Sequence, residues 1–334
     1  MNFKKLLFWS GFLLIILLLT VFLSLRLGPV NITFKKILES IFQRKETLQS
    51  SIIFNIRLPR IILGLAIGGS LSLAGLILQG LFRNPLVEPY TLGISGGAGL
   101  GICLAYLLRL NYFLESLFLP LWGFLGASIV ILILYSLTLK KRIINLSNLL
   151  LIGVMISFIS SSFIMLIMAT TKLENLEGII FWIMGSLALE DWRLIKLVFV
   201  LSLLGLGISY FFSLQLNALS LGEEKALQLG VNVERTKKIL LILASLLTGI
   251  SVSTCGIIGF VGLVVPHFVR IFLGSDNRLL LITSFLYGGI FLILSDTLAR
   301  IIILPLELPV GVVTGIIGGG LFIYLLTQRK IYYA

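Results

Sequence analysis

The chain has 334 residues, of which 58% are hydrophobic and only 12% are charged. A soluble domain carries roughly 25% charged residues, so this composition argues against a soluble protein and indicates a polytopic, all-α membrane protein. The formal net charge of +12 would suggest nucleic-acid binding in a soluble protein. Here it is better explained by loop lysines and arginines that set membrane topology and meet anionic headgroups.

The first apolar run, from Leu6 to Leu25, follows Lys4 and Lys5. About 20 residues is too long for the apolar region of a typical signal peptide, and no small-x-small cleavage site follows. We therefore expect an uncleaved first membrane helix with its N-terminus in the cytoplasm. In residues 34–42 the apolar residues recur with the period of an amphipathic helix, which predicts a helix on the outer membrane surface.

Further apolar runs bring the expected number of spans to about ten, in a single membrane domain covering residues 1–334. The boundary inside 239–273 is the least distinct, because no charge separates its two runs. That stretch is too long for one span, and Gly256, Gly259 and Gly262 offer a place to turn. The runs are 61–82, 92–108, 113–139, 146–169, 194–214, 239–255, 256–273, 279–298 and 309–327.

Two segments between spans are too short to cross a bilayer. Residues 179–189 are apolar and predict a re-entrant or half-membrane helix, while residues 299–309 are broken by Pro305 and Pro309. The longest internal loop, 215–238, is polar and contains helix formers followed by Gly230, a typical C-cap residue. We expect this loop to be a structured docking surface in the cytoplasm.

The distribution of lysine and arginine supports cytoplasmic termini, since an even number of spans places both ends on one side. Of the 26 basic residues, 14 are expected inside and 12 outside, seven of the latter within 26–60. Without that segment the ratio is 14 to 5, as the positive-inside rule predicts. The excess, which ends in Arg57 and Arg60, has two explanations: an amphipathic helix touching headgroups, or an acidic partner outside.

Few ionisable residues lie inside the expected spans, which argues against a proton-coupled pump or ion exchanger. Asp296 and Arg300 are four residues apart near the outer end of the ninth span and could be either a structural pair or a site. Arg83 and Glu88 flank a turn at 80–91 and are expected to be solvated. Glycines four residues apart, such as Gly64 and Gly68, predict close helix packing.

The chain lacks the motifs of a nucleotidase or hydrolase. It has no Walker A sequence, no nucleophile elbow and no HExxH motif. Cys103, Cys255 and the single histidine, His267, have no metal-ligand spacing, so no metal site is predicted.

A set of ordered motifs runs along the chain. These are Arg57-Leu58-Pro59-Arg60, Gln79-Gly80-Leu81-Phe82-Arg83-Asn84-Pro85-Leu86, Leu92-Gly93-Ile94-Ser95-Gly96-Gly97, Gly259-Phe260-Val261-Gly262, Asp296-Thr297-Leu298-Ala299-Arg300 and Glu307-Leu308-Pro309-Val310-Gly311. Together they resemble the permease family of type II ABC importers that move iron–siderophore complexes, haem and cobalamin. The resemblance covers essentially the whole chain.

The resemblance implies the type II ABC importer permease fold, with two permease subunits, identical or paralogous, around a central path. It also implies two cytoplasmic ATPase subunits, which hold ATP and magnesium, and an external substrate-binding protein. This chain would itself bind no cofactor and would not be an enzyme. It would lie in the bacterial cytoplasmic membrane with both termini in the cytoplasm.

By the same resemblance, Arg57, Arg60 and Arg300 face outward and meet acidic residues of the binding protein. Asn84, Leu86 and Ser147 fall where family members narrow the path at its cytoplasmic end, and His267 is an interface or packing residue. The loop that matches the family's coupling helices would contact the ATPase. Its residues are Leu221, Gly222, Glu223, Glu224, Ala226 and Gly230.

The expected function is import of an iron–siderophore complex by alternating access, driven by partner ATPases. Cobalamin and haem stay open as substrates within the same family. A secondary transporter not coupled to ATP is the alternative from another class. Neighbouring genes for an ATPase and a secreted binding protein would discriminate between these two classes.

Overall fold

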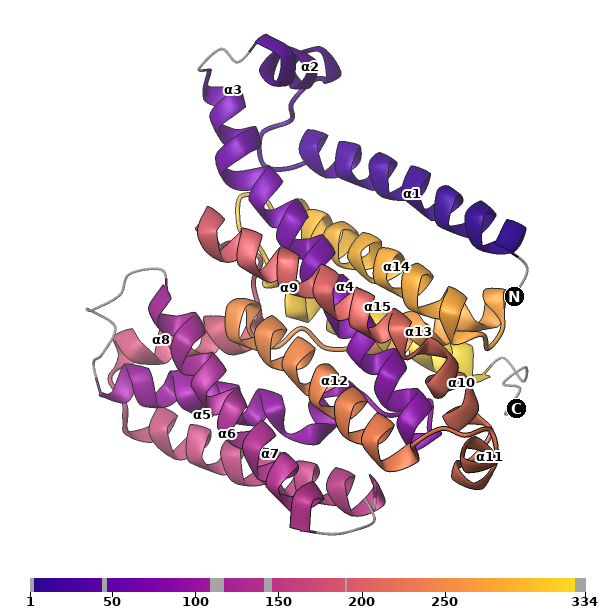
Figure 1. The fold of residues 1–334 in the computed structure, drawn as a ribbon. Helices are drawn as coiled ribbons and strands as arrows, with labels where there is room; N and C mark the ends of the chain where they lie inside the picture. The colour runs from indigo at the N-terminus through magenta and orange to yellow at the C-terminus, as the bar shows by residue number, and fades with distance from the viewer. Residues whose placement is uncertain (1–2, 44–46, 109–116, 141–145, 190, 328–334) are drawn as a thin grey trace.

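The computed structural model describes residues 3–43, 47–108, 117–140, 146–189 and 191–327, and within them the fold is all-α (Figure 1). Short π-helical and 3₁₀ segments, η1 (Ile52–Arg57) and η2 (Pro89–Leu92), precede two of the helices. The helices are α1 (Phe3–Arg26), α2 (Phe34–Gln43), α3 (Leu48–Ser51), α4 (Leu58–Phe82), α5 (Ile94–Leu107), α6 (Phe118–Lys140), α7 (Leu146–Thr170), α8 (Leu173–Met184), α9 (Trp192–Phe211), α10 (Ser213–Ser220), α11 (Glu223–Gln228), α12 (Val233–Cys255), α13 (Val261–Leu273), α14 (Asn277–Ala299) and α15 (Val310–Thr327).

The prediction of about ten membrane helices is confirmed. In the described residues, seven helical stretches are long and apolar enough to cross a membrane, and α5, α13 and α15 are shorter apolar helices. The predicted amphipathic helix is α2, whose Ile37 is buried while Phe34 and Phe42 are exposed.

Helix α4 is the centre of the bundle, and Figure 1 shows it running between α9, α12 and α14. It is buried along most of its length because small residues let neighbouring backbones approach. A Cβ atom on Gly68 would overlap the carbonyl of Gly288 in α14, and one on Gly75 would overlap the carbonyl of Gly262 in α13. The close packing predicted at Gly68 is therefore confirmed.

The predicted interruption within 239–273 is also confirmed: α12 ends at Cys255, and α13 begins at Val261. The chain turns at Gly256, whose φ is +71°, and at Phe260, whose φ of +67° is rare for a non-glycine residue. This non-helical stretch, residues 256–260, is called the α12–α13 break below.

The break is joined to the end of α8 and the start of α15. The backbone N–H of Ser186 donates to the carbonyl of Cys255 over 2.8 Å, and a Cβ atom on Gly256 would overlap the carbonyl of Trp182. A Cβ atom on Gly311 would overlap the carbonyl of Met184. With 12 residues, α8 is about 18 Å long, so the prediction of a helix too short to span is confirmed, although it begins and ends six and five residues earlier than expected.

Candidate functional site

Four charged side chains gather at one end of the bundle, where α4 begins and α14 ends; we call this the arginine end. Arg300 Nε lies 3.0 Å from Asp296 Oδ2, and Arg60 Nη1 lies 2.8 Å from Glu307 Oε2. All four residues line one cavity of about 160 Å³, beside Ser186 and the residues that precede α15. The spacing of Asp296 and Arg300 alone allowed either a structural pair or a functional site. The structure shows that the two side chains pair, and a role in a site stays a prediction.

Arg300 also ties α14 to α1. Its Nη2 donates to Ser24 Oγ over 2.8 Å, and its side chain is only 2% exposed. Burial of a charge is costly unless the charge is paired and hydrogen-bonded, and both conditions are met here. The contacts of Arg300 therefore join the ends of α14 and α1 without leaving a buried charge unpaired.

Arg57 lies in the interior rather than on the surface. Its guanidinium donates to the carbonyls of Leu25 and Val30, in the last turn of α1 and the connection that follows. Carbonyls at a helix C-terminus lack helical partners and attract cations, which explains the position of the side chain. A Cβ atom on Gly28 would lie 2.7 Å from Arg57 Nη2, so a larger residue there would displace the end of the Arg57 side chain.

This geometry corrects the expectation that all three arginines face outward. Arg57 and Arg300 are each 2% exposed and satisfied within the chain, whereas the Arg60 side chain is 12% exposed and opens onto the cavity. Arg60 is thus the arginine of this group that a partner can reach. Its ion pair with Glu307 was not predicted.

A second polar cluster lies deep in the bundle, where the connection from α4 to α5 packs on the α12–α13 break. The Glu88 carboxylate accepts a hydrogen bond from the backbone N–H of Phe260 over 2.7 Å. The Tyr90 hydroxyl donates to the carbonyl of Ile258 over 2.8 Å and accepts from its N–H over 3.0 Å. Two side chains thus satisfy the polar backbone that the helix break exposes, as irregular backbone at membrane depth requires.

The expectation that Glu88 is solvated was therefore wrong, while Arg83 is exposed as predicted. A loop carboxylate next to a proline usually lies in water, and nothing local distinguishes Glu88 from that case. The signal that could have indicated the contact was the predicted turn near Gly256 and Gly262, because it creates unpaired backbone groups that need partners.

We expect Glu88→Leu to destabilise the permease by about 1–3 kcal/mol, since it leaves the Phe260 N–H buried without an acceptor. Glu88→Gln keeps an acceptor oxygen and should stay within about 1 kcal/mol of the parent chain. The measurement is denaturant unfolding of the purified permease in detergent. If both variants lost the same stability, the cause would be loss of the negative charge rather than loss of the hydrogen-bond acceptor.

The residues expected to narrow the path occupy two elements. Asn84 Oδ1 accepts from the N–H of Leu86 over 2.9 Å and so shapes the turn after α4, and both residues are exposed. Ser147 is exposed in the first turn of α7. Six residues further along, Gly153 packs against Thr91 and Leu92 of η2, so α7 and this connection are neighbours. The gating role stays a prediction.

The loop 215–238, expected to couple to an ATPase, contains most of α10 and all of α11. It lies at the end of the bundle opposite the arginine end. Gly222 and Gly230 have φ values of +116° and +78°, which confirms the predicted helix end at Gly230. Ala226 is buried, and Glu223 Oε2 lies 2.5 Å from Nζ of the buried Lys237 in α12. Leu221 is 61% exposed, and Glu224 is exposed beside it. The segment is thus fixed to the bundle but presents an outer surface.

A polar network connects α10 to the start of α14. Asn217 Nδ2 donates to Asp276 Oδ1 over 3.0 Å, and the Asn277 N–H donates to Asn217 Oδ1 over 2.8 Å. Hydrogen bonds from Arg278 lower the pKa of Asp276 to about 2, so this carboxylate stays charged at neutral pH. Since α14 carries Asp296 at its other end, the network links the coupling loop to the arginine end through one helix.

His267, expected to be an interface or packing residue, lies in α13 and packs against α15 within this chain. It is 8% exposed, and its ring meets Phe322 of α15 edge-on, with ring centroids 6.0 Å apart.

Comparison with known proteins shows which family this chain belongs to. The model of the FecCD transport family matches residues 16–328. The chain is 36% identical to the hemin transport permease HmuU of Yersinia pestis, over 96% of this chain and 95% of that protein. It is also 36% identical to the ferric dicitrate permease FecD of Escherichia coli, over 92% of this chain and 94% of that protein.

The fold has a solved counterpart, described as an inward-facing metal-chelate type ABC transporter. That structure is 31% identical, with a TM-score of 0.85 over 96% of this chain and 98% of its own. ATP hydrolysis in such transporters belongs to separate subunits, in agreement with a chain that has no Walker A motif. The chain belongs to the FecCD transport family and is an integral membrane permease of an ABC importer.

Proposed function

We propose that this permease carries an iron–siderophore chelate across the cytoplasmic membrane by alternating access. The observation that carries the proposal is the likeness, over nearly the whole chain, to the metal-chelate type transporter. Relatives named for hemin, vitamin B12 and molybdate import keep other cargoes open, and haem and cobalamin are the alternatives within the proposal. A chelate arrives with its metal already coordinated, so the permease needs no ligand cluster of its own.

The docking surface that we propose for the binding protein is the arginine end. Arg60 contacts an acidic side chain of the partner directly. Arg300 lines the same cavity and contributes its charge without direct contact with the partner, and Arg57 positions the connection from α1 that borders the surface. Complementary charge at such a surface raises the association rate and fixes the orientation of docking.

The ATPase contact in this proposal is the segment Leu221–Gly230, and the narrowest part of the path lies near Asn84, Leu86 and Ser147. Two permease subunits, identical or paralogous, enclose the path. ATP-driven movement of the coupling segment passes to the preceding helix α10, whose Asn217 is hydrogen-bonded to the start of α14. It also passes to α12 through the Glu223–Lys237 pair. Switching between outward and inward access then follows from rigid-body movement of packed helices.

Growth of a strain that lacks this gene tests the proposal. With a ferric siderophore as sole iron source we expect no growth, and growth should return when the gene is supplied on a plasmid. If the deletion strain grew as well as the parent on the chelate but failed on haem or cobalamin, then haem or cobalamin would be the transported substrate. Uptake that survives ATP depletion but not an uncoupler would support a secondary transporter.

A further inference from the structure

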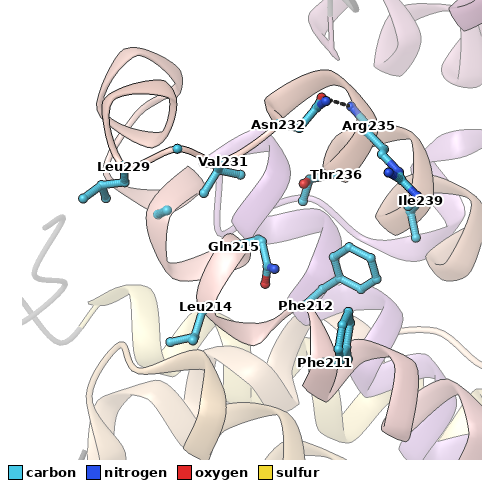
Figure 2. A pocket seen from close by; sticks show the side chains of 12 residues that line it. Phe211, Phe212, Leu214, Gln215, Leu229, Val231, Asn232, Arg235, Thr236 and Ile239 are labelled. Atoms are coloured by element: carbon cyan, nitrogen blue, oxygen red, sulfur yellow. Dashed lines mark hydrogen bonds between the residues drawn. The ribbon is translucent and has the colours of Figure 1, made fainter.

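A cavity of about 610 Å³ lies where the end of α9, helix α10 and the start of α12 meet (Figure 2). The end of the coupling segment, Leu229 and Gly230, borders this cavity, but the residues assigned to binding-protein docking and to gating do not line it. Figure 2 shows aromatic side chains from α9 on one side, Gln215 of α10 facing inward, and Thr236 and Arg235 on α12 opposite. The cavity thus has one apolar and one polar wall.

The apolar wall continues along the surface of α9. Leu197, Val200, Leu204, Ile208 and Phe211 follow at intervals of three and four residues, and each is 45–76% exposed. This spacing places them on one helix face. Because α9 is apolar and long enough to span, we assign this exposed stripe to lipid contact. The stripe ends at Phe211, which is 76% exposed and lines the cavity, so the cavity opens at the membrane–water boundary.

The polar wall carries a positive charge without an acidic residue beside it in the described lining. Arg235 is exposed in the first turn of α12, and it is the charged residue among those that line the cavity. Lys237, two residues later, is instead buried against Glu223. Gln215, which also lines the cavity, has a buried Oε1 without a hydrogen-bond partner, so this oxygen can accept from a ligand.

We propose that this cavity binds the headgroup of an anionic phospholipid of the phosphatidylglycerol type. The phosphate pairs with Arg235, a glycerol hydroxyl donates to Gln215 Oε1, and one acyl chain follows the α9 stripe past Phe211. Basic pockets at the end of membrane helices are suited to such headgroups. A zwitterionic lipid fits less well because it brings a cation toward Arg235, and a free phosphate leaves the apolar wall in water.

Native mass spectrometry of the detergent-purified transporter with its ATPase subunits tests this site. Titration with dioleoyl phosphatidylglycerol should show one tightly bound lipid per permease, and dioleoyl phosphatidylcholine should bind more weakly. Arg235→Gln removes a charge-assisted contact and should weaken phosphatidylglycerol binding about tenfold. Lys238→Gln, a half-exposed cation of α12 outside both the lining and the coupling segment, is the matched control and should bind as the parent does.

Glycerol phosphate added in excess should not displace the lipid; displacement would indicate a soluble phosphate site instead. Equal phosphatidylglycerol binding by Arg235→Gln and the parent would overturn the proposal. If Arg235→Gln kept the lipid but lost its ATPase subunits, the cavity would be a contact for the ATPase. Neither result depends on the identity of the transported substrate.

Discussion

Replacing Asp296 by leucine is expected to lower the free energy of unfolding of the permease by about 3–5 kcal/mol. The carboxylate lies 3.0 Å from Arg300 Nε, and both side chains are less than 8% exposed. Loss of the carboxylate leaves a buried guanidinium with only hydroxyl and carbonyl partners, among them Ser24 Oγ. The cost comes from the uncompensated charge, rather than from the attraction that is lost.

The double variant Asp296→Leu/Arg300→Met separates these two contributions. Removing both charges leaves no buried ion, so the double variant should recover more than half of the stability lost by Asp296→Leu. The measurement is a double-mutant cycle. It compares denaturant unfolding in detergent for the parent, both single variants and the double variant. A cost below about 1 kcal/mol for Asp296→Leu would mean that water reaches Arg300 and that the end of α14 is open.

Local patterns in the sequence predict most of the fold. Apolar runs gave the helices, and three glycines in an otherwise unbroken run located the α12–α13 break. The contact between Asp296 and Arg300 is one of the two outcomes that their spacing allows, and the helix end at Gly230 follows from a glycine after a run of helix formers. These features depend on runs and spacings within one continuous stretch of chain, so the sequence contains the information needed for them.

The partners of Arg57 and Glu88 could not be predicted in the same way. Glu88 meets a backbone N–H 172 positions away, and Arg57 meets carbonyls 32 and 27 positions away. The charge or polarity of a residue shows that its side chain needs a partner when buried. It does not show which residue, far along the chain, supplies that partner. The sequence therefore grouped Arg57 with Arg60 and Arg300, as the structure does, but was wrong about its exposure. It also missed the Arg60–Glu307 pair, because Glu307 comes from a different segment.

Arg60→Glu is expected to abolish uptake and stimulation of ATP hydrolysis by the binding protein. A truncated charge in an interface costs about 2–5 kcal/mol, so reversal should weaken docking by a hundredfold or more. The same change also places a third carboxylate in the cavity beside Asp296 and Glu307, at a side chain that is only 12% exposed, so it will cost the permease some stability. Folding of the variant is therefore measured alongside uptake. Loss of uptake without loss of folding would thus point to the partner.

The exchange Arg60→Glu/Glu307→Arg distinguishes docking from a purely internal role. It restores an ion pair at the same place but moves the positive charge from α4 to the segment before α15. If Arg60 recognises an acidic partner, the exchange variant should unfold like the parent and still fail to respond to the binding protein. Recovery of both stability and uptake would show that Arg60 acts only through Glu307. In that case the excess of positive charge in residues 26–60 would be explained by contact with lipid headgroups.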